Sequence, residues 1–256
     1  MTRQPVLIVV VAALVAIGRL PQVQAQDRGN AAATPRASAP IDFTGYWVAF
    51  VTEDWRYRMV TPPKGDYDGV PMTAEARQIA ESWDAAADEA AGNQCRSYGA
   101  AAIMRVPGRL HITWEDDRTL RIDTDAGTQT RLFHFDAPPA APGGPTWQGF
   151  SSAQWERPAR GRGAGPETSM AGGSIKVVTR MMRAGYLRRN GVPYSENAEL
   201  TEYFELSPYP GGGQLLVVTA VVEDPRYLRQ PFIVSSQFKK EADGSRWDPT
   251  QCSARW

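Results

Sequence analysis

The chain has 256 residues, with 28 basic and 28 acidic side chains and two histidines. This length fits a single domain, and the balanced charge leaves no basic surface of the kind that attracts nucleic acid or an anionic membrane. The sequence holds no Gly-x-Ser-x-Gly, His-Glu-x-x-His, phosphate-loop or dinucleotide motif. It therefore argues against the commonest hydrolases, zinc proteases and nucleotide enzymes. We expect no metal site, no cofactor and no nucleic-acid partner.

Residues 1–25 have the parts of a secretory signal peptide. A basic start precedes an apolar run over 6–17, and Val23-Gln24-Ala25 fits the small-x-small rule of signal peptidase. An apolar run of about a dozen residues is too short to span a bilayer, and a retained anchor is the alternative. We expect cleavage before Gln26, a periplasmic or secreted protein, and no stable membrane insertion after cleavage.

Residues 26–40 are rich in Ala, Pro, Arg and Ser and lack periodicity, which predicts a disordered linker. The folded domain is then expected over residues 41–256. It holds two cysteines, Cys95 and Cys252, and an even count in an exported chain favours one disulfide between them. Such a bond would pin the C-terminal tail to the segment that precedes residue 100.

Residues 100–136 alternate short runs of β-branched and aromatic residues with turn signals, a pattern typical of an antiparallel meander. The turn signals are Pro107-Gly108, Asp116-Asp117 and Asp125-Ala126-Gly127. This stretch also holds both histidines of the protein, so it is the first place to look for chemistry.

The two histidines need not meet. If the turn at 116–117 has two residues, His111 lies opposite Ile122; if the next turn has three, His134 lies opposite Arg118. The rings then share one face of the sheet but lie roughly 16 Å apart, by strand spacing and rise. A two-residue second turn would put them on opposite faces. Neither register predicts a shared metal site.

Further strands are predicted where apolar and polar residues alternate. They cover residues 43–52, 53–60, 146–156, 174–182, 199–206, 214–222 and 232–240. A short helix is predicted over 73–83, because Thr73-Ala74-Glu75-Ala76 imitates a capping box, and a second helical turn over 85–91. The glycine-rich stretch over 161–173 is either a lid or a disordered insertion.

Nine or ten strands joined mostly by short loops favour a closed or nearly closed barrel or a β-sandwich, because closure removes exposed edges. A barrel of this size can hold one small ligand. The sequence thus predicts a mainly β, antiparallel domain with one principal helix that caps or plugs it.

Six stretches resemble a family of exported, uncharacterised bacterial proteins. They are GYW at 45–47, EDWR at 53–56, VTPPKGDY at 60–67, GRLHITWE at 108–115, NGVPYSEN at 190–197 and VEDP at 222–225. The resemblance covers nearly the whole mature domain. It implies an antiparallel lipocalin-like, or calycin-like, β-barrel and brings no established catalytic residues.

Two motifs carry chemistry of their own. On a strand, Glu53 and Trp55 would share one face while Asp54 and Arg56 share the other; an ion pair at the barrel rim is the alternative. Tyr194, in a loop between strands, would offer a phenol to a pocket mouth, with a capped turn as the alternative.

Aromatic rings spread over five predicted strands are usually core, but in an open barrel they would wall a pocket with a few polar contacts. We expect one end of the barrel to gather Trp55, Trp147, Tyr194 and at least one histidine around a cavity. The ligand-binding candidates are Trp55, Arg56, His111, Arg131, His134, Trp147 and Tyr194. The catalytic candidates are His111, His134, Glu53, Asp54 and Tyr194.

The favoured function is a binding protein for a small, partly apolar molecule, aromatic or isoprenoid-like. The second is a cofactor-independent lyase, isomerase or cyclase that uses histidine and carboxylate groups for proton transfer in the same cavity. The third is a structural module of the cell envelope. A strongly shifted buried histidine or carboxylate would favour the enzyme, an apolar pocket the binding protein, and a filled interior the structural role.

The first testable prediction concerns export. Protein purified from the periplasm or the medium should begin at Gln26, and its intact mass should be two hydrogens below that of the reduced chain. Two thiols that react with an alkylating reagent without prior reduction would contradict the predicted bond between Cys95 and Cys252.

Overall fold

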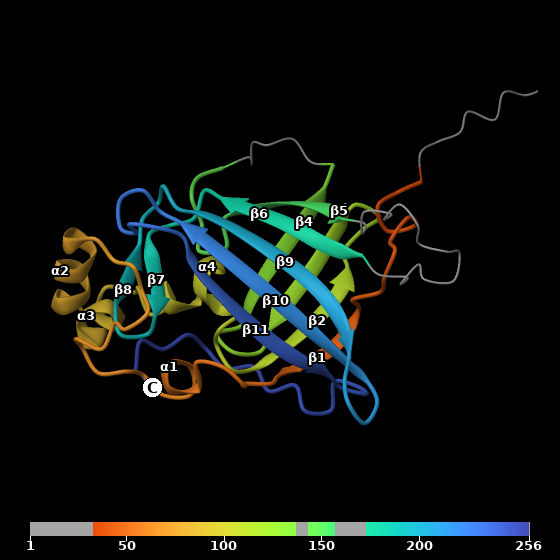
Figure 1. Ribbon diagram of the computed structural model, residues 1–256, viewed down its shortest axis with the longest axis horizontal. Helices are drawn as coiled ribbons and strands as arrows, with labels where there is room; N and C mark the ends of the chain where they lie inside the picture. The colour runs from red at the N-terminus through yellow and green to blue at the C-terminus, as the bar shows by residue number, and fades with distance from the viewer. Residues whose placement is uncertain (1–32, 137–142, 157–172, 256) are drawn as a thin grey trace, which may run out of the picture. The chain divides into compact units, whose positions relative to one another are not determined.

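The structure, a computed structural model, describes residues 33–136, 143–156 and 173–255. Within these residues, nine strands form a closed barrel (Figure 1). In chain order they are β1 (Gly45–Ala49), β2 (Arg109–Trp114), β3 (Thr119–Thr124), β4 (Gln129–Phe135), β5 (Phe150–Glu156), β6 (Ser174–Arg180), β9 (Glu199–Pro208), β10 (Gln214–Glu223) and β11 (Phe232–Lys240). The order around the barrel is β1-β11-β10-β9-β6-β5-β4-β3-β2, and all neighbours are antiparallel except β4 and β5.

The closed barrel confirms the predicted mainly β, antiparallel fold and is consistent with a lipocalin-like architecture. The strand predicted over 232–240 has the observed bounds, and those over 199–206 and 214–222 differ by one or two residues at their ends. The strand predicted over 146–156 begins only at Phe150, because Thr146 makes a single bridge to Met182. The parallel pairing of β4 with β5 is not apparent from the alternation.

Both turns of the meander are one residue longer than the tight turns considered from the sequence. His111 therefore pairs with Asp123, and His134 pairs with Thr119. The two shifts cancel across the three strands, so both histidines still lie on one face, the outer face of the barrel. Turn length was the uncertain step, because several loop lengths are compatible with the same turn residues.

The barrel interior is filled with side chains. Inward-facing residues of all nine strands form one packed cluster, in which Trp47, Ile112, Phe133 and Phe204 are at most 1% exposed. Each such side chain contributes about 1.5–3 kcal/mol through burial. The aromatic rings at strand spacing are therefore largely core.

One ion pair lies inside this apolar interior. Arg131 on β4 donates to both carboxylate oxygens of Glu202 on β9, at 2.9 and 2.6 Å, and to Thr179 on β6 at 3.3 Å. Thr179 also shares a hydrogen bond of 2.8 Å with Ser151 on β5. The bidentate geometry satisfies the buried charges and ties four neighbouring strands together across the interior.

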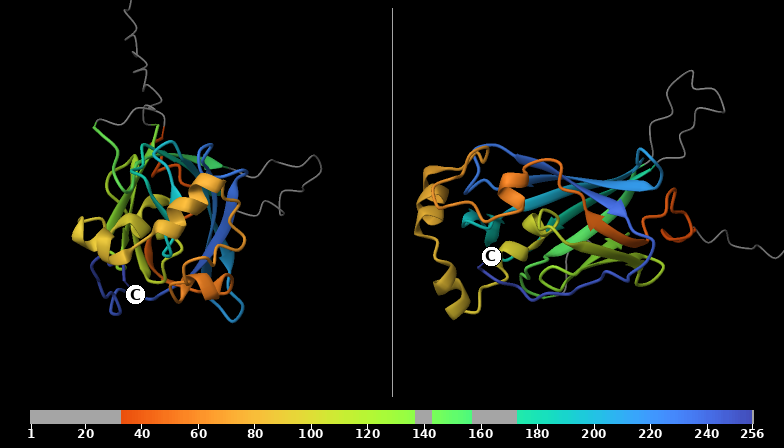
Figure 2. Two further views of the ribbon diagram at one scale, coloured as in Figure 1. Left: turned by 90° about the vertical axis from the view of Figure 1, so that its left-hand side faces the viewer. Right: turned by 90° about the horizontal axis from the view of Figure 1, so that it is seen from below.

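Short helices and a hairpin gather at one end of the barrel (Figure 2). They are α1 (Trp55–Arg58), α2 (Ala74–Ser82), α3 (Ala85–Ala90), the 3₁₀ turn η1 (Arg96–Tyr98), α4 (Ala100–Ile103), β7 (Gly185–Arg188) and β8 (Val192–Tyr194). We call this group the cap. None of the helices in the described residues is long and apolar enough to cross a membrane.

The predicted helix is confirmed as α2. The hydroxyl of Thr73 accepts a hydrogen bond from the backbone N–H of Ala76 at 3.2 Å, which satisfies a free donor of the first turn. The second helical turn is confirmed as α3. The cap is nevertheless richer than one principal helix, because α1, η1, α4 and the β7–β8 hairpin are additional elements.

The strand predicted over residues 53–60 is wrong, because this segment forms α1. Trp55 and Met59, four residues apart, are 66% and 55% exposed, whereas Arg58 is buried and its Nε donates to the carbonyl of Arg105 at 3.0 Å. A spacing of four residues places two side chains on the same face of a helix. The alternation of aromatic and charged residues in this segment therefore wrongly indicated a strand.

The end of the predicted linker also differs from the expected disorder. The carbonyl of Pro35 accepts a hydrogen bond from Trp155 Nε1 at 3.0 Å, and Arg36 N donates to the carbonyl of Asp117 at 3.1 Å. Residues 33–40 are thus ordered by contacts that composition alone does not indicate. The predicted signal peptide, residues 26–32 and, except for Gly173, the stretch over 161–173 lie outside the described residues.

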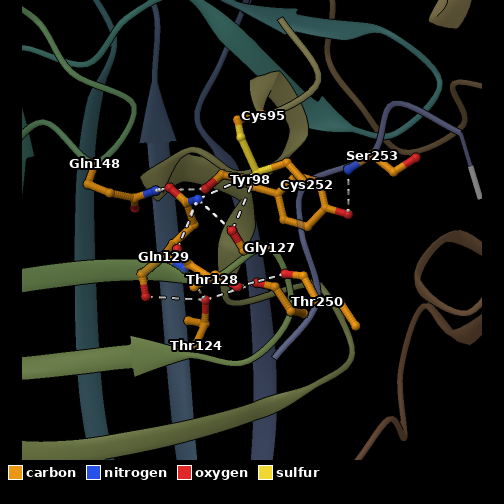
Figure 3. The surroundings of a disulfide bond; sticks show 11 residues. Cys95, Tyr98, Thr124, Gly127, Thr128, Gln129, Gln148, Thr250, Cys252 and Ser253 are labelled. Carbon is orange, nitrogen blue, oxygen red and sulfur yellow. Dashed lines mark hydrogen bonds between the residues drawn. A yellow bond between two sulfur atoms is a disulfide. The ribbon is translucent and has the colours of Figure 1, made fainter. Parts of the chain in front are cut away.

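Cys95 and Cys252 form the predicted disulfide, across a separation of 157 residues (Figure 3). Beside it, Thr128 donates to the carbonyl of Thr250 at 2.8 Å and Gln129 Nε2 lies 3.4 Å from Cys252 Sγ. Cys95 immediately precedes η1, so the bond fixes both the C-terminal tail and η1. Closing so long a loop stabilises the fold by up to about 5 kcal/mol in the chain-entropy model.

The second prediction concerns the interior ion pair. Arg131→Met should lower the free energy of unfolding by about 3–5 kcal/mol, because it leaves Glu202 buried without its counter-ion. The double variant Arg131→Met, Glu202→Leu should recover most of that loss. Urea denaturation measures both, and a single variant as stable as the wild type would contradict this role of the pair.

Candidate functional site

The two histidines lie on the outer face of the barrel, in separate surroundings. His111 stacks on Tyr46 with ring centroids 4.1 Å apart, and Trp247 of the C-terminal tail meets the edge of this pair. His134 stacks on Phe150 at 5.0 Å, and burial is the main cause that lowers the pKa of its imidazole. Neither ring faces the barrel interior.

The other predicted site residues are spread over three places. Arg131 is inside the barrel, committed to Glu202. Tyr194 is fully buried in a second apolar cluster beneath the cap, where burial raises the pKa of its phenol above the usual range. Trp147 lies under the guanidinium of Arg183 at 4.2 Å and borders, with His134, an outer hollow of about 370 Å³.

The motif at residues 53–56 lies next to two buried arginines, Arg58 and Arg105. Trp55 is exposed, and Arg56 pairs with Asp66 at the surface. Asp54 bonds to Arg105 at 3.0 Å, and Glu53 lies 3.8 Å from Arg58. The predicted convergence of Trp55, Trp147, Tyr194 and a histidine is not observed; only His134 and Trp147 border a common hollow.

Four buried arginines meet at a small cavity of about 20 Å³ between the barrel end and the cap. They are Arg58, Arg105, Arg188 and Arg189, and the remaining lining residues are Tyr57, Ser97, Ala102, Val106 and Leu187. We call this the arginine cavity. Its volume admits one small group, since a single water needs about 10–15 Å³ and pockets for whole organic ligands are far larger.

Three chain segments bring these four side chains together. Arg58 comes from α1 and Arg105 from the turn after α4, where its N–H bonds to the carbonyl of Ala102 at 2.8 Å. Arg188 comes from β7, in which a bulge lets consecutive side chains be buried. Gly191, with φ of +83°, makes the sharp hairpin turn that a residue with a Cβ rarely adopts.

Several guanidinium nitrogens at the cavity are buried without a hydrogen-bond partner among the described residues: Nη1 and Nη2 of Arg58, Nη1 of Arg105 and Nε of Arg188. One other nitrogen of each group is anchored, and that of Arg105 bonds to Asp54. Arg58 Nε bonds to the carbonyl of Arg105, and Arg188 Nη1 to that of Asp68 at 2.8 Å. Each guanidinium is thus held in place by the protein while part of its donor capacity stays unused.

The nearby carboxylates neutralise these charges only in part. Glu53 accepts hydrogen bonds from Thr52 at 2.8 Å and Ser235 at 3.3 Å, which hold it 3.8 Å from Arg58, beyond hydrogen-bonding distance. Asp54 bonds to Arg105 from a carboxylate that is 39% exposed. Arg58 therefore keeps both terminal nitrogens as a free fork of the kind that grips an oxyanion.

Burial lowers the pKa values of two of these arginines. Loss of hydration, reinforced by the charge of Arg105, lowers the pKa of Arg58 to about 10, and loss of hydration lowers that of Arg189 to about 10 as well. Both groups are still charged at neutral pH. Because their pKa values are lower in the folded state, these charges oppose folding at every pH below about 10, and stability is regained only as the pH rises above that value toward the ordinary pKa of arginine.

The chemistry that this arrangement offers is anion binding. Arginine stays protonated at neutral pH and cannot serve there as a general base, so the cavity has donors and positive charge rather than a proton-transfer pair. Among the described residues, no three His, Cys, Asp or Glu side chains are placed to hold a metal ion. The sequence matches no protein-family model, no curated protein and no solved structure, so the functional argument rests on this geometry.

The arginine cavity was missed because its residues are far apart in the sequence and belong to no known motif. One signal was present. Arg105 stands between Met104 and Val106, so it interrupts an apolar stretch of the chain. A charged residue that interrupts an apolar run is a sign of a buried polar site, because such residues are seldom fully buried otherwise.

The third prediction compares two buried arginines. Arg58→Met should change the free energy of unfolding by less than about 1 kcal/mol, because the relief of a poorly compensated charge offsets the lost bond to Arg105. Arg131, whose two terminal nitrogens both bond to Glu202, is the matched control, and its replacement by Met should cost several times more. Equal losses in urea denaturation would contradict the charge state assigned to the cavity.

Proposed function

We propose that this protein is an exported binding protein for a small, partly apolar molecule whose anionic group is held in the arginine cavity. The observation that carries the proposal is the free fork of Arg58, buried beside unpaired donors of Arg105 and Arg188. Uncompensated buried cations each cost several kcal/mol, and a bound anion removes that cost. A site of this kind binds tightly because its donors are already oriented.

The partly apolar character of the ligand is supported by the segment that closes the cavity. Of the six exposed large apolar side chains in the described ranges, four lie between residues 50 and 60: Phe50, Trp55, Met59 and Val60. The cavity itself has room only for the head of a ligand. The rest of the molecule would lie outside it, where these side chains offer apolar contact.

Export to the periplasm or the medium is supported by two features. The start of the sequence has the composition of a signal peptide, and the disulfide between Cys95 and Cys252 is typical of oxidising compartments. Membership of the exported bacterial family that the sequence resembles is part of the same proposal. The lipocalin-like barrel serves here as a rigid frame for the cap.

The alternatives are less well supported. An acid–base enzyme would need a histidine or carboxylate pair within a cavity, whereas His111 and His134 lie on the outer face. A purely structural module would agree with the filled barrel interior, but it gives no reason for unpaired arginine donors at the end of the barrel.

The fourth prediction is stabilisation by anions. Millimolar sulfate, phosphate or acetate is substituted for chloride in the buffer at constant ionic strength. The anion that binds most tightly in the cavity should raise the melting temperature. An anion at about 100 times its Kd adds about 2.7 kcal/mol to the free energy of unfolding, which corresponds to several degrees.

The matched control is Arg58→Met, which removes the free fork and should abolish the effect while leaving general salt effects in place. Differential scanning calorimetry measures both proteins. Equal anion responses of the wild type and Arg58→Met would overturn the proposed site, because they would reveal only the general action of such salts on proteins.

A further inference from the structure

We propose that the anionic group is a tetrahedral oxyanion, a phosphate or sulfate group, and that it displaces Asp54 from Arg105 when it binds. This inference rests on the proposed function of the arginine cavity and goes further, because it names the ligand's head group and the internal carboxylate with which that group competes.

The shape of the donor set favours a tetrahedral group. The unpaired nitrogens belong to three guanidinium groups, Arg58, Arg105 and Arg188, which reach the cavity from three different segments of the chain. The hydroxyl-bearing Ser97 of η1 lines it as well. A carboxylate presents two oxygens in one plane and is matched by one arginine fork. Unpaired donors that converge from three guanidinium groups on separate elements match an anion whose oxygens point in several directions.

Asp54 occupies one of these donors from the surface. Its Oδ2 accepts a hydrogen bond from Arg105 Nη2 at 3.0 Å, in a pair whose arginine side chain is 7% exposed and whose aspartate side chain is 39% exposed. The carboxylate can therefore turn into water at little cost, while the guanidinium has to stay. Arg105 is therefore a buried cation whose surface partner, Asp54, can be replaced by another anion.

The backbone at Asp54 points to the same exchange. Asp54 is the N-cap of α1, but its φ of +52° is left-handed and its side chain caps no N–H of the helix. An N-cap aspartate usually has extended backbone angles and accepts a hydrogen bond from the first turn. The bond to Arg105 thus keeps Asp54 from its usual role. Once released, the carboxylate is free to cap α1, which offsets part of the lost ion pair.

Displacement also frees a donor. Arg105 lines the cavity, so the departure of the Asp54 carboxylate releases Nη2 of Arg105 beside it. Nη2 of Arg105 then joins its Nη1, so a second complete fork faces the ligand beside that of Arg58.

The fifth prediction is tested by calorimetric titration of the mature protein with sodium sulfate, sodium phosphate and sodium acetate at pH 7.5 and fixed ionic strength. Sulfate or phosphate should bind at least about tenfold more tightly than acetate, because a tetrahedral group can accept from three guanidinium groups at once. Acetate that binds as tightly as both would overturn the choice of head group and leave anion binding intact. The absence of binding by all three would instead overturn the proposed function.

Asp54→Asn tests the displacement. Asparagine has the same shape, tolerates the left-handed backbone and carries no charge, so the variant should fold as the wild type does. It should bind the preferred anion about tenfold more tightly, because the competing carboxylate is gone. Glu75→Gln is the control, since it removes an equal charge from a surface pair with Arg226, and its affinity should stay within about twofold of the wild type.

Equal affinities of Asp54→Asn and the wild type would overturn the displacement while the anion site stands. A gain in Glu75→Gln as large as that in Asp54→Asn would also overturn it, because the effect would then arise from net charge alone. A tighter Asp54→Asn beside an unchanged Glu75→Gln supports the proposal, and the relative affinities of sulfate and phosphate then identify the preferred head group.

Discussion

Guanidinium groups repel one another and lose their hydration when they are buried together. In this protein Arg58, Arg105 and Arg188 bring α1, the turn after α4 and β7 around one cavity. Each is anchored to a main-chain carbonyl or a surface carboxylate and keeps donors without a partner among the described residues. Arg131 differs, because both of its terminal nitrogens bond to the buried carboxylate of Glu202 inside the barrel.

The barrel itself was predictable, because alternation over β9, β10 and β11 is a period-two pattern that only a sheet with one buried face explains. The details of the barrel were harder to predict. The predicted loops of the meander were each one residue too short. The prediction that the two histidines share a face was right only because the two shifts cancelled. The segment over 53–60 was wrong, since a helix with an exposed stripe at a spacing of four residues and a strand can share one pattern of aromatic and charged residues over so short a stretch.

The candidate site was beyond the sequence for a physical reason. Arg58, Arg105 and Arg188 are brought together only by the tertiary fold, and no local pattern records that their side chains point to one place. The motif over 53–56 did indicate charged groups of interest, but Glu53 and Asp54 are counter-ions of Arg58 and Arg105, which line the cavity, rather than proton-transfer groups. Packed side chains such as Trp47 and Phe133 fill the barrel interior, whereas Trp55 and Trp147 lie outside it, so we propose a ligand site at the capped end instead.

The most direct measurement is a crystal structure grown with selenate, a tetrahedral oxyanion whose selenium can be located by anomalous scattering. We expect one anomalous peak in the arginine cavity, within hydrogen-bonding reach of Arg58, Arg105 and Arg188, with the carboxylate of Asp54 turned toward solvent. Selenate found only on the outer face, with the arginine cavity filled by water and Asp54 still bonded to Arg105, would contradict the assignment of the cavity as the binding site.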